Sequence, residues 1–178
     1  MFSAAAYCSC AEMTKFGSRY KTHSMNLDLK GKNALVCGSS KGIGKAAAFE
    51  LAKLGANVTL VSRSVDKMAA ITKQMARVQG QQHDFLAADF TNPKDLKRKV
   101  RGLTATKTIH ILVNNTGGPP AGPITEAEEE AFMQAYTTHL ICNHLLAKAV
   151  LTDMRQAEYG RIINVISTCG KAPLANLG

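Results

Sequence analysis

The feature that most constrains the fold is a glycine-rich turn between an apolar strand and an apolar helix. The sequence predicts the strand at 33–37 and the helix at 42–54. Between them, Gly38, Gly42 and Gly44 follow the spacing Gly-x3-Gly-x-Gly. Glycines allow a tight turn and let a pyrophosphate approach the main chain, while the free N–H groups at the helix start attract the anion. The turn therefore predicts a dinucleotide-binding α/β unit.

The spacing of this turn argues against two other phosphate-binding motifs. It does not match Gly-x-Gly-x-x-Gly, the more familiar dinucleotide pattern. A P-loop would need glycine where Ser39 stands, and Ser or Thr where Ala46 follows Lys45. Cleavage of ATP or GTP is therefore disfavoured.

Two further loops follow apolar strands. Residues 114–118, with the sequence NNTGG, follow a strand expected at 109–113, and Ser167 follows a strand expected at 161–166. In open α/β sheets, ligands bind in the crevice beyond the carboxyl ends of the strands. The three loops together predict one site at that edge.

The expected strands alternate with expected helices along the chain. This alternation implies right-handed crossovers and a parallel sheet. We predict a Rossmann-type, doubly wound α/β fold with strand order 3-2-1-4-5. The remaining elements are expected at 57–62, 65–78, 82–87, 93–104 and 126–156, the last being a long helical region with one possible break.

Length and composition fit a single domain of 178 residues with 46% hydrophobic residues and no tryptophan. The core is expected to consist of Ala, Val, Leu and Ile. No apolar run approaches the roughly 18 residues of a membrane span, so a membrane partner is not expected.

The formal charge of +9 comes partly from a basic stretch on the helix at 93–104 and just after it. One interpretation is a nucleic-acid interface; the other is a solvated helix face with Leu96, Val100 and Leu103 turned inward. The second is favoured, because no aromatic residues alternate with the charges. The charge would still attract a phosphate-bearing cofactor or an acidic carrier protein. The basic residues are Lys94, Lys97, Arg98, Lys99, Arg101 and Lys107.

The five cysteines are widely scattered. Cys37, Cys142 and Cys169 lie in apolar segments and are expected to be small buried hydrophobes. The pair Cys8-x-Cys10 has no second ligand pair, so no metal site is assigned.

Residues 1–24 differ from the rest in being rich in Ser, Ala and basic residues, with Glu12 as the one acid. We expect a disordered leader or an upstream stretch before a start at Met25; a transit peptide is the alternative. The expected location is cytoplasmic, or mitochondrial if the transit peptide is real. The domain proper is then 25–178.

The chain resembles the short-chain dehydrogenase/reductase family, and is similar to 3-oxoacyl-[acyl-carrier-protein] reductases. The family turn Thr-Gly-x3-Gly-x-Gly is matched except that Cys37 replaces the threonine. The Asn-Asn-Ala-Gly loop corresponds to 114–117, and Gly-Arg-Ile-x-Asn-x-x-Ser corresponds to 160–167. The resemblance covers about residues 27–178.

This resemblance implies a cofactor site around the glycine-rich turn. An NAD site has an acidic residue after the second strand, but Arg63 stands there and its planar fork suits a 2′-phosphate. NADP(H) is therefore favoured over NAD(H), with Ser40 and Lys41 adding to the phosphate contact. The turn contributes Gly38, Ser40, Lys41, Gly42, Ile43 and Gly44.

The adenosine half would be held by the next two loops. The resemblance implies that Asp89 bonds the adenine amino group and that the backbone of Phe90 adds to the contact; a helix cap is the alternative role for Asp89. Asn114 would tie the central strands together and flank the ribose. The loop contributes Asn115 and Gly117 to the cofactor site.

Family chemistry uses a serine, a tyrosine, a lysine and an asparagine, with hydride coming from the nicotinamide. Ser167 matches the serine that orients the substrate carbonyl, although a turn-capping role is the alternative. His139 stands at the asparagine position, where it either hydrogen-bonds or is a buried helix residue. Both are candidate catalytic residues.

The tyrosine of the family falls about thirteen residues after Ser167, whereas the sequence ends at Gly178. Tyr159 and Lys171 have the wrong spacing to replace the Tyr-x-x-x-Lys pair. We therefore expect an NADP(H)-dependent oxidoreductase that is inactive as this chain, lacking the last strands of the fold. The alternative is a non-catalytic NADP(H)-binding or regulatory remnant.

The implied partners are a small-molecule or acyl-carrier-bound substrate, and further copies of the chain in any longer form. Poor solubility is expected of this chain, through exposure of Leu145, Leu146 and Leu151 on the long helical region.

Overall fold

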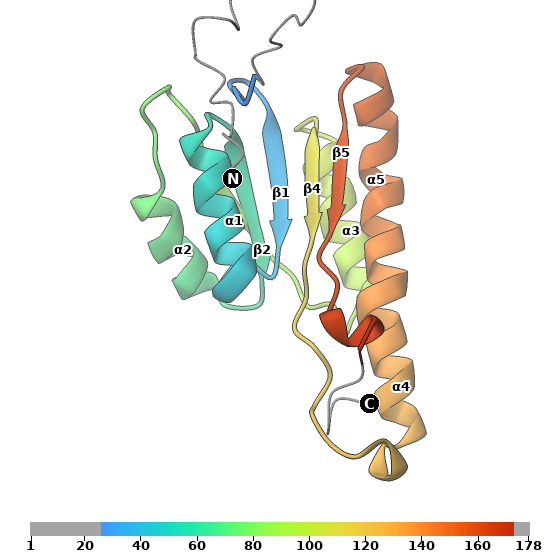
Figure 1. Cartoon of the computed structure of the whole chain (residues 1–178). Helices are drawn as coiled ribbons and strands as arrows, with labels where there is room; N and C mark the ends of the chain where they lie inside the picture. Colours follow the sequence, from blue (N-terminus) through green and yellow to red (C-terminus); the bar gives the residue numbers. More distant parts are fainter. Residues whose placement is uncertain (1–25, 173–178) are drawn as a thin grey trace, which may run out of the picture.

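The computed structural model describes residues 26–172, so the expectation about the leader at 1–24 lies outside the described residues. Its centre is a five-stranded sheet of order β3-β2-β1-β4-β5, and every neighbouring pair is parallel (Figure 1). The predicted fold class and strand order are confirmed. The strands are β1 Asn33–Cys37, β2 Asn57–Ser62, β3 Asp84–Ala87, β4 Ile111–Asn114 and β5 Arg161–Asn164.

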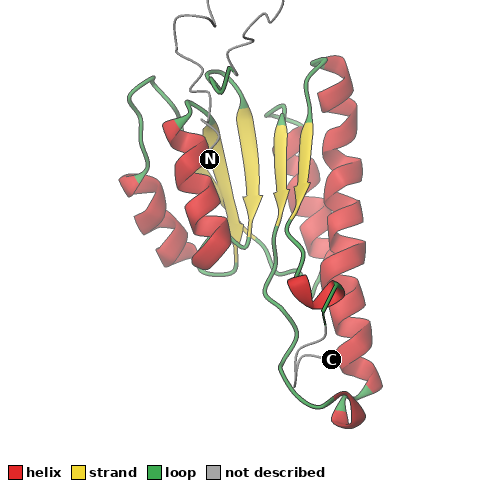
Figure 2. Ribbon diagram, in the orientation of Figure 1, coloured by secondary structure: helices red, strands yellow, loops and turns green. Residues whose placement is uncertain are grey.

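Helices cover both faces of the sheet (Figure 2). Helices α1 and α2 pack against one face, and α3 and α5 pack against the other. Alternate residues of β1 serve the two cores: Ala34 and Val36 face the first pair of helices, while Leu35 and Cys37 face the second. The helices are α1 Gly42–Lys53, α2 Val65–Gln74, α3 Pro93–Thr104, α4 Glu129–Tyr136 and α5 Cys142–Gln156.

The apolar spacing predicts that Ile43, Ala47, Leu51 and Leu54 share one face of the helix at 42–54 and that Gly55 ends it in a left-handed conformation. The face that α1 presents to the sheet differs from this prediction. The buried residues of α1 are Gly44, Ala48 and Ala52. Ile43, which was expected to face the core, is 64% exposed. The smallest side chains lie at the centre of this contact and allow the helix to approach the sheet closely, while Phe49 and Leu51, which are partly buried, pack against the same core. The predicted left-handed end is confirmed at Gly55, whose φ is +99°.

Several element boundaries also differ from the prediction. Helix α2 ends at Gln74 instead of 78, because the backbone of Met75 is extended and its side chain is buried. The break in the long helical region is a π-helical segment, η3 Thr137–Ile141, between α4 and α5. Strand β5 ends at Asn164, two residues before the predicted end.

The basic stretch is a solvated helix face, as favoured above. Leu96 and Val100 are fully buried, and Leu103 packs at the edge of the same core. Arg98 and Lys99 form ion pairs with Asp95, and their hydrogen bonds hold the pKa of this carboxyl below its usual value. The basic residues of this stretch therefore lie mainly on the solvent-exposed face of α3, where two of them pair with Asp95.

Two expectations about apolar residues need correction. Leu146 is buried against α3, and only Leu151 of the three leucines is clearly exposed, at 40%. Cys37 and Cys142 are buried as expected, whereas Cys169 is half-buried.

Within the described part of the chain, no helix combines the length and apolarity that crossing a bilayer requires.

Candidate functional site

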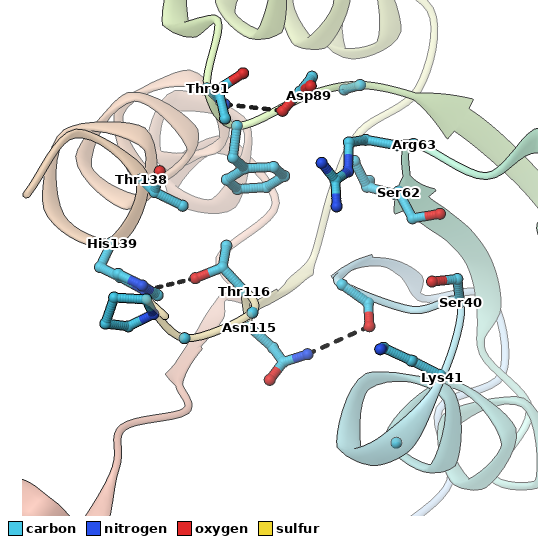
Figure 3. Close-up of a pocket in the computed structure, with 18 of the residues that line it drawn as sticks. Ser40, Lys41, Ser62, Arg63, Asp89, Thr91, Asn115, Thr116, Thr138 and His139 are labelled. Atoms are coloured by element: carbon cyan, nitrogen blue, oxygen red, sulfur yellow. Dashed lines mark hydrogen bonds between the residues drawn. The ribbon is translucent and has the colours of Figure 1, made fainter. Parts of the chain in front are cut away.

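A cleft of about 920 Å³ lies at the carboxyl edge of the sheet. The turn after β1 and the loops after β2, β3 and β4 line it, and α4 with η3 closes the far side (Figure 3). Its size is typical of a small-molecule or cofactor site. The predicted cofactor residues line it directly except for Gly44, which is buried in α1, and Asn114.

The glycine-rich turn has no room for side chains at two points. A Cβ atom on Gly38, which has a φ of +59°, would lie 2.5 Å from the carbonyl oxygen of Asn115. A Cβ atom on Gly44 would lie 2.5 Å from the carbonyl oxygen of Gly38. The amide of Asn115 donates to the carbonyls of Cys37 and Gly38, at 3.3 and 3.4 Å. The turn and the loop after β4 are therefore locked together.

The start of α1 is open to an anion. Lys41 is the N-cap residue, and no side chain in the described part of the chain caps the first turn of this helix. The orphan N–H groups of a helix start carry partial positive charge. Ser39 holds the turn from below, with its hydroxyl donating to the carbonyl of Val61 at 3.3 Å.

Positive side chains gather at one end of the cleft. Lys41, Arg63 and Lys67 line it, while Asp89 is the one acidic residue among its described lining residues. Figure 3 shows the guanidinium of Arg63 directed into the cleft, above Ser40 and Lys41. Lys67 was not predicted from the sequence; its signal is its place four residues after Arg63, in the first turn of α2.

Asp89 and Phe90 form the next part of the wall. An Asp89 carboxylate oxygen accepts from the backbone N–H of Thr91 at 2.9 Å. The alternative role as a helix cap belongs to Asn92 instead, whose side chain accepts from the N–H of Asp95. Asp89 is therefore free of the cap and faces the cleft.

The thiols of Cys142 and Cys37 are buried in one core cluster, against which Phe90 packs. The Sγ of Cys142 donates to the carbonyl of Phe90 at 3.2 Å. Burial, with a further contribution from Asp89, raises the pKa of the Cys142 thiol to about 11. Burial raises the pKa of Cys37 to about 12. Both thiols stay protonated at neutral pH, so neither is a nucleophile.

Asn114 and Asn115 lie in different surroundings. The amide of Asn114 donates to Asn164 Oδ1 at 2.8 Å, which ties β4 to β5 as predicted. Asn114 is buried and does not line the cleft, whereas Asn115 does. The predicted position of Asn114 beside the ribose is therefore wrong, because its side chain is used within the sheet.

His139 reaches the cleft from the π-helical segment. Its Nδ1 lies 2.6 Å from Oγ1 of Thr116, and both residues are half-buried and line the cleft (Figure 3). His139 is therefore a cleft residue rather than a core residue. Thr116 was not predicted as a site residue; its signal is the threonine in place of the family alanine.

Of the two predicted catalytic residues, Ser167 lies apart from the cleft. Its side chain is exposed and does not line the cleft in the described part of the chain. Its Oγ accepts from the N–H of Cys169 at 3.1 Å and caps the short helix η4, Thr168–Gly170. The side chain of Ser167 therefore has the turn-capping role that was its alternative interpretation.

The comparisons with known proteins agree with this architecture. The sequence model of the short chain dehydrogenase family matches residues 32–178. A 3-oxoacyl-[acyl-carrier-protein] reductase FabG of Vibrio cholerae is 36% identical, over 84% of this chain and 62% of that protein. The hydroxysteroid dehydrogenase-like protein 1 of Gallus gallus is 32% identical, over 81% of this chain and 45% of that protein.

Solved structures show the same fold. The L-sorbose reductase of Gluconobacter frateurii, complexed with NADPH and L-sorbose, has a TM-score of 0.77 and 31% identity, over 84% of this chain and 57% of that one. A metagenomic short-chain oxidoreductase in complex with NADP has a TM-score of 0.75 and 33% identity, over 83% and 67%.

The parallel sheet of order β3-β2-β1-β4-β5 and the glycine-rich turn at its carboxyl edge define a Rossmann-type α/β protein. The chain belongs to the short-chain dehydrogenase/reductase family. It spans about half the length of the Gallus gallus relative and less than two thirds of the Vibrio cholerae reductase.

Proposed function

We propose that the cleft binds NADP(H) and that the protein is an oxidoreductase that reduces a carbonyl or oxidises the matching alcohol. The observation that carries this proposal is the cluster of Lys41, Arg63 and Lys67 beside the glycine-rich turn. Its substrate would be a small molecule or a 3-oxoacyl group on a carrier protein.

The residues present fit a dinucleotide phosphate. Positions 38 and 44 would be filled by any Cβ atom, which leaves the main chain of the turn bare for a pyrophosphate. The uncapped start of α1 supplies N–H donors and positive charge to that group. Asp89, with one carboxylate oxygen already bonded to Thr91, retains acceptor capacity for an adenine amino group.

The preference for NADP(H) over NAD(H) follows from the residues after β2. An acidic residue there would accept from a ribose 2′-hydroxyl. Arg63 instead donates from a planar guanidinium, which matches a phosphate. The structure of the related sorbose reductase is a complex with NADPH, which supports the same choice.

The chemistry supplied by the bound cofactor is hydride transfer to or from the carbonyl carbon. Among the residues of this chain, Ser167 would donate a hydrogen bond to the substrate oxygen as negative charge develops on it. His139, on the opposite wall of the cleft, would offer a hydrogen bond to the bound ligand. For Ser167 to act, the η4 segment has to approach the cleft.

A non-catalytic NADP(H)-binding role is the second candidate. One relative, of Homo sapiens, is 31% identical and is named inactive hydroxysteroid dehydrogenase-like protein 1. The residues proposed to hold the cofactor line the cleft without Ser167, so this candidate needs no contribution from Ser167.

Fluorescence titration of the 178-residue chain with NADPH and with NADH tests the binding proposal. We expect saturable binding of NADPH and weaker binding of NADH. If neither NADPH nor NADH binds, both candidate functions are overturned. Turnover of a 3-oxoacyl thioester by the NADPH-bound chain would favour the oxidoreductase over the binding protein.

A further inference from the structure

The pair Thr116 and His139 joins two walls of the cleft. Thr116 belongs to the loop after β4, and His139 belongs to η3, 23 residues further along the chain. In Figure 3 the pair lies across the cleft from Arg63. Both side chains line the cleft, so the hydrogen bond between them sets how the imidazole stands at its surface.

The tautomer of the imidazole decides which group donates. The distance from Oγ1 of Thr116 to Nδ1 of His139 is 2.6 Å, and either group can be the donor. When the hydroxyl donates to Nδ1, the proton of the neutral ring is carried on Nε2, which is then a donor. The phosphate and hydroxyl oxygens of a dinucleotide in the cleft would favour this tautomer, because they accept hydrogen bonds.

The other ring nitrogen remains available to a ligand. In the described residues, Nε2 of His139 has no hydrogen-bond partner within the protein. The residue stands in a π-helical segment between α4 and α5, an irregularity that occurs often at functional sites. A fixed Nε2–H group is a single directed donor, whereas an unrestrained ring alternates between donor and acceptor.

We infer that Thr116 is a positioning residue that fixes His139 as an Nε2–H donor toward an acceptor oxygen of the bound dinucleotide. This inference rests on the proposed binding of NADP(H). The competing explanation is mechanical: the bond only fastens the loop after β4 to the helix. The two explanations differ in what happens to the tautomer and to cofactor affinity.

The test combines nitrogen NMR of the imidazole with NADPH titration. The variants are Thr116→Val, which keeps the shape but removes the hydroxyl, and Thr116→Ser, which restores it. Thr108→Val is the matched control, because Thr108 is exposed and does not line the cleft. Thermal unfolding of each variant reports loss of the fastening role.

We expect the free wild-type chain and Thr116→Ser to show one Nε2–H tautomer at neutral pH. Thr116→Val should show exchange between tautomers and about fivefold weaker NADPH binding, the order of one hydrogen bond. In a His139→Ala background, Thr116→Val should have no further effect on affinity, since the two residues act as one unit.

Two outcomes would overturn the inference. One is an Nδ1–H tautomer, or free exchange, in the wild-type chain. The other is a Thr116→Val chain that binds NADPH like the wild type while unfolding at lower temperature. Failure of the proposed function would look different, since no variant, wild type included, would then bind NADPH.

Discussion

A Cβ atom on Gly44 would lie 2.5 Å from the carbonyl oxygen of Gly38 and 2.8 Å from Nδ2 of Asn115. The start of α1 thus packs directly against the carbonyl of Gly38 and the side-chain amide of Asn115, and neither group can move away freely. This contact makes the cofactor turn and the fold around it depend on the same position.

Gly44→Ala should therefore weaken NADPH binding and lower the free energy of unfolding by about 2–3 kcal/mol, as overpacking in a core does. Urea unfolding and NADPH titration measure the two effects. The matched control is Gly102→Ala in α3, where an added Cβ atom meets nothing within 4 Å. That variant should gain about 0.5–1 kcal/mol. Equal stability of the two variants would contradict the packing argument.

Arg63→Asp should weaken NADPH binding about tenfold or more while sparing NADH, because a carboxylate repels a 2′-phosphate and accepts from a 2′-hydroxyl. Parallel fluorescence titrations with the two cofactors measure the ratio of dissociation constants. Arg101→Asp makes the same charge change at an exposed position on α3, outside the cleft. An equal loss in both variants would reduce the role of Arg63 to general charge attraction.

The sequence predicts the sheet order because strands and helices alternate and the glycine spacing marks the first crossover. It does not predict which side of α1 is buried, since Gly44, Ala48 and Ala52 carry almost no hydrophobic signal. That face depends on how close the helix lies to the sheet, which is a property of the packed structure. The same limit applies to Met75, whose burial ends α2 early.

The candidate site likewise has a part that the sequence predicts and a part that depends on the packed structure. The turn, Arg63 and Asp89 are predicted because each follows a strand end, and parallel strand ends meet at one edge. The bond between Thr116 and His139 is not predicted, because 23 residues separate them and only the path of η3 brings them together. The geometry of Ser167 depends on the short η4 turn, for which no periodic pattern exists.

Two partly buried histidines should make stability depend on pH. Nδ1 of His83 accepts from the N–H of Val58 at 3.2 Å, and Nδ1 of His110 accepts from the N–H of Asn33 at 3.0 Å. Protonation would remove both acceptors. The pKa of each is lowered from 6.5, chiefly by burial, with Arg77 adding to the shift at His83 and Lys32 at His110.

The sign follows from these pKa directions. Below 6.5 the unfolded chain binds protons that the folded chain does not, so the free energy of unfolding falls as the pH drops toward the folded values. Above 6.5 this contribution is complete. The urea midpoint should therefore decrease between pH 7.5 and pH 5. His83→Gln with His110→Gln should flatten that slope, and an unchanged slope in the double variant would refute the assignment.

Ser167→Ala separates catalysis from capping. In an active preparation of the protein, a hydroxyl that donates to the developing oxyanion contributes roughly 3–4 kcal/mol, so its removal should lower kcat about a hundredfold or more. NADPH affinity should stay nearly constant, because Ser167 does not line the cofactor cleft. If the hydroxyl only accepts from the N–H of Cys169, its loss should cost about 1 kcal/mol of stability and leave kcat intact. Thr168→Val, at the exposed neighbouring position, is the control for disturbance of η4 itself. A fall in kcat shared by both variants, or one that tracks unfolding, would leave Ser167 as a cap.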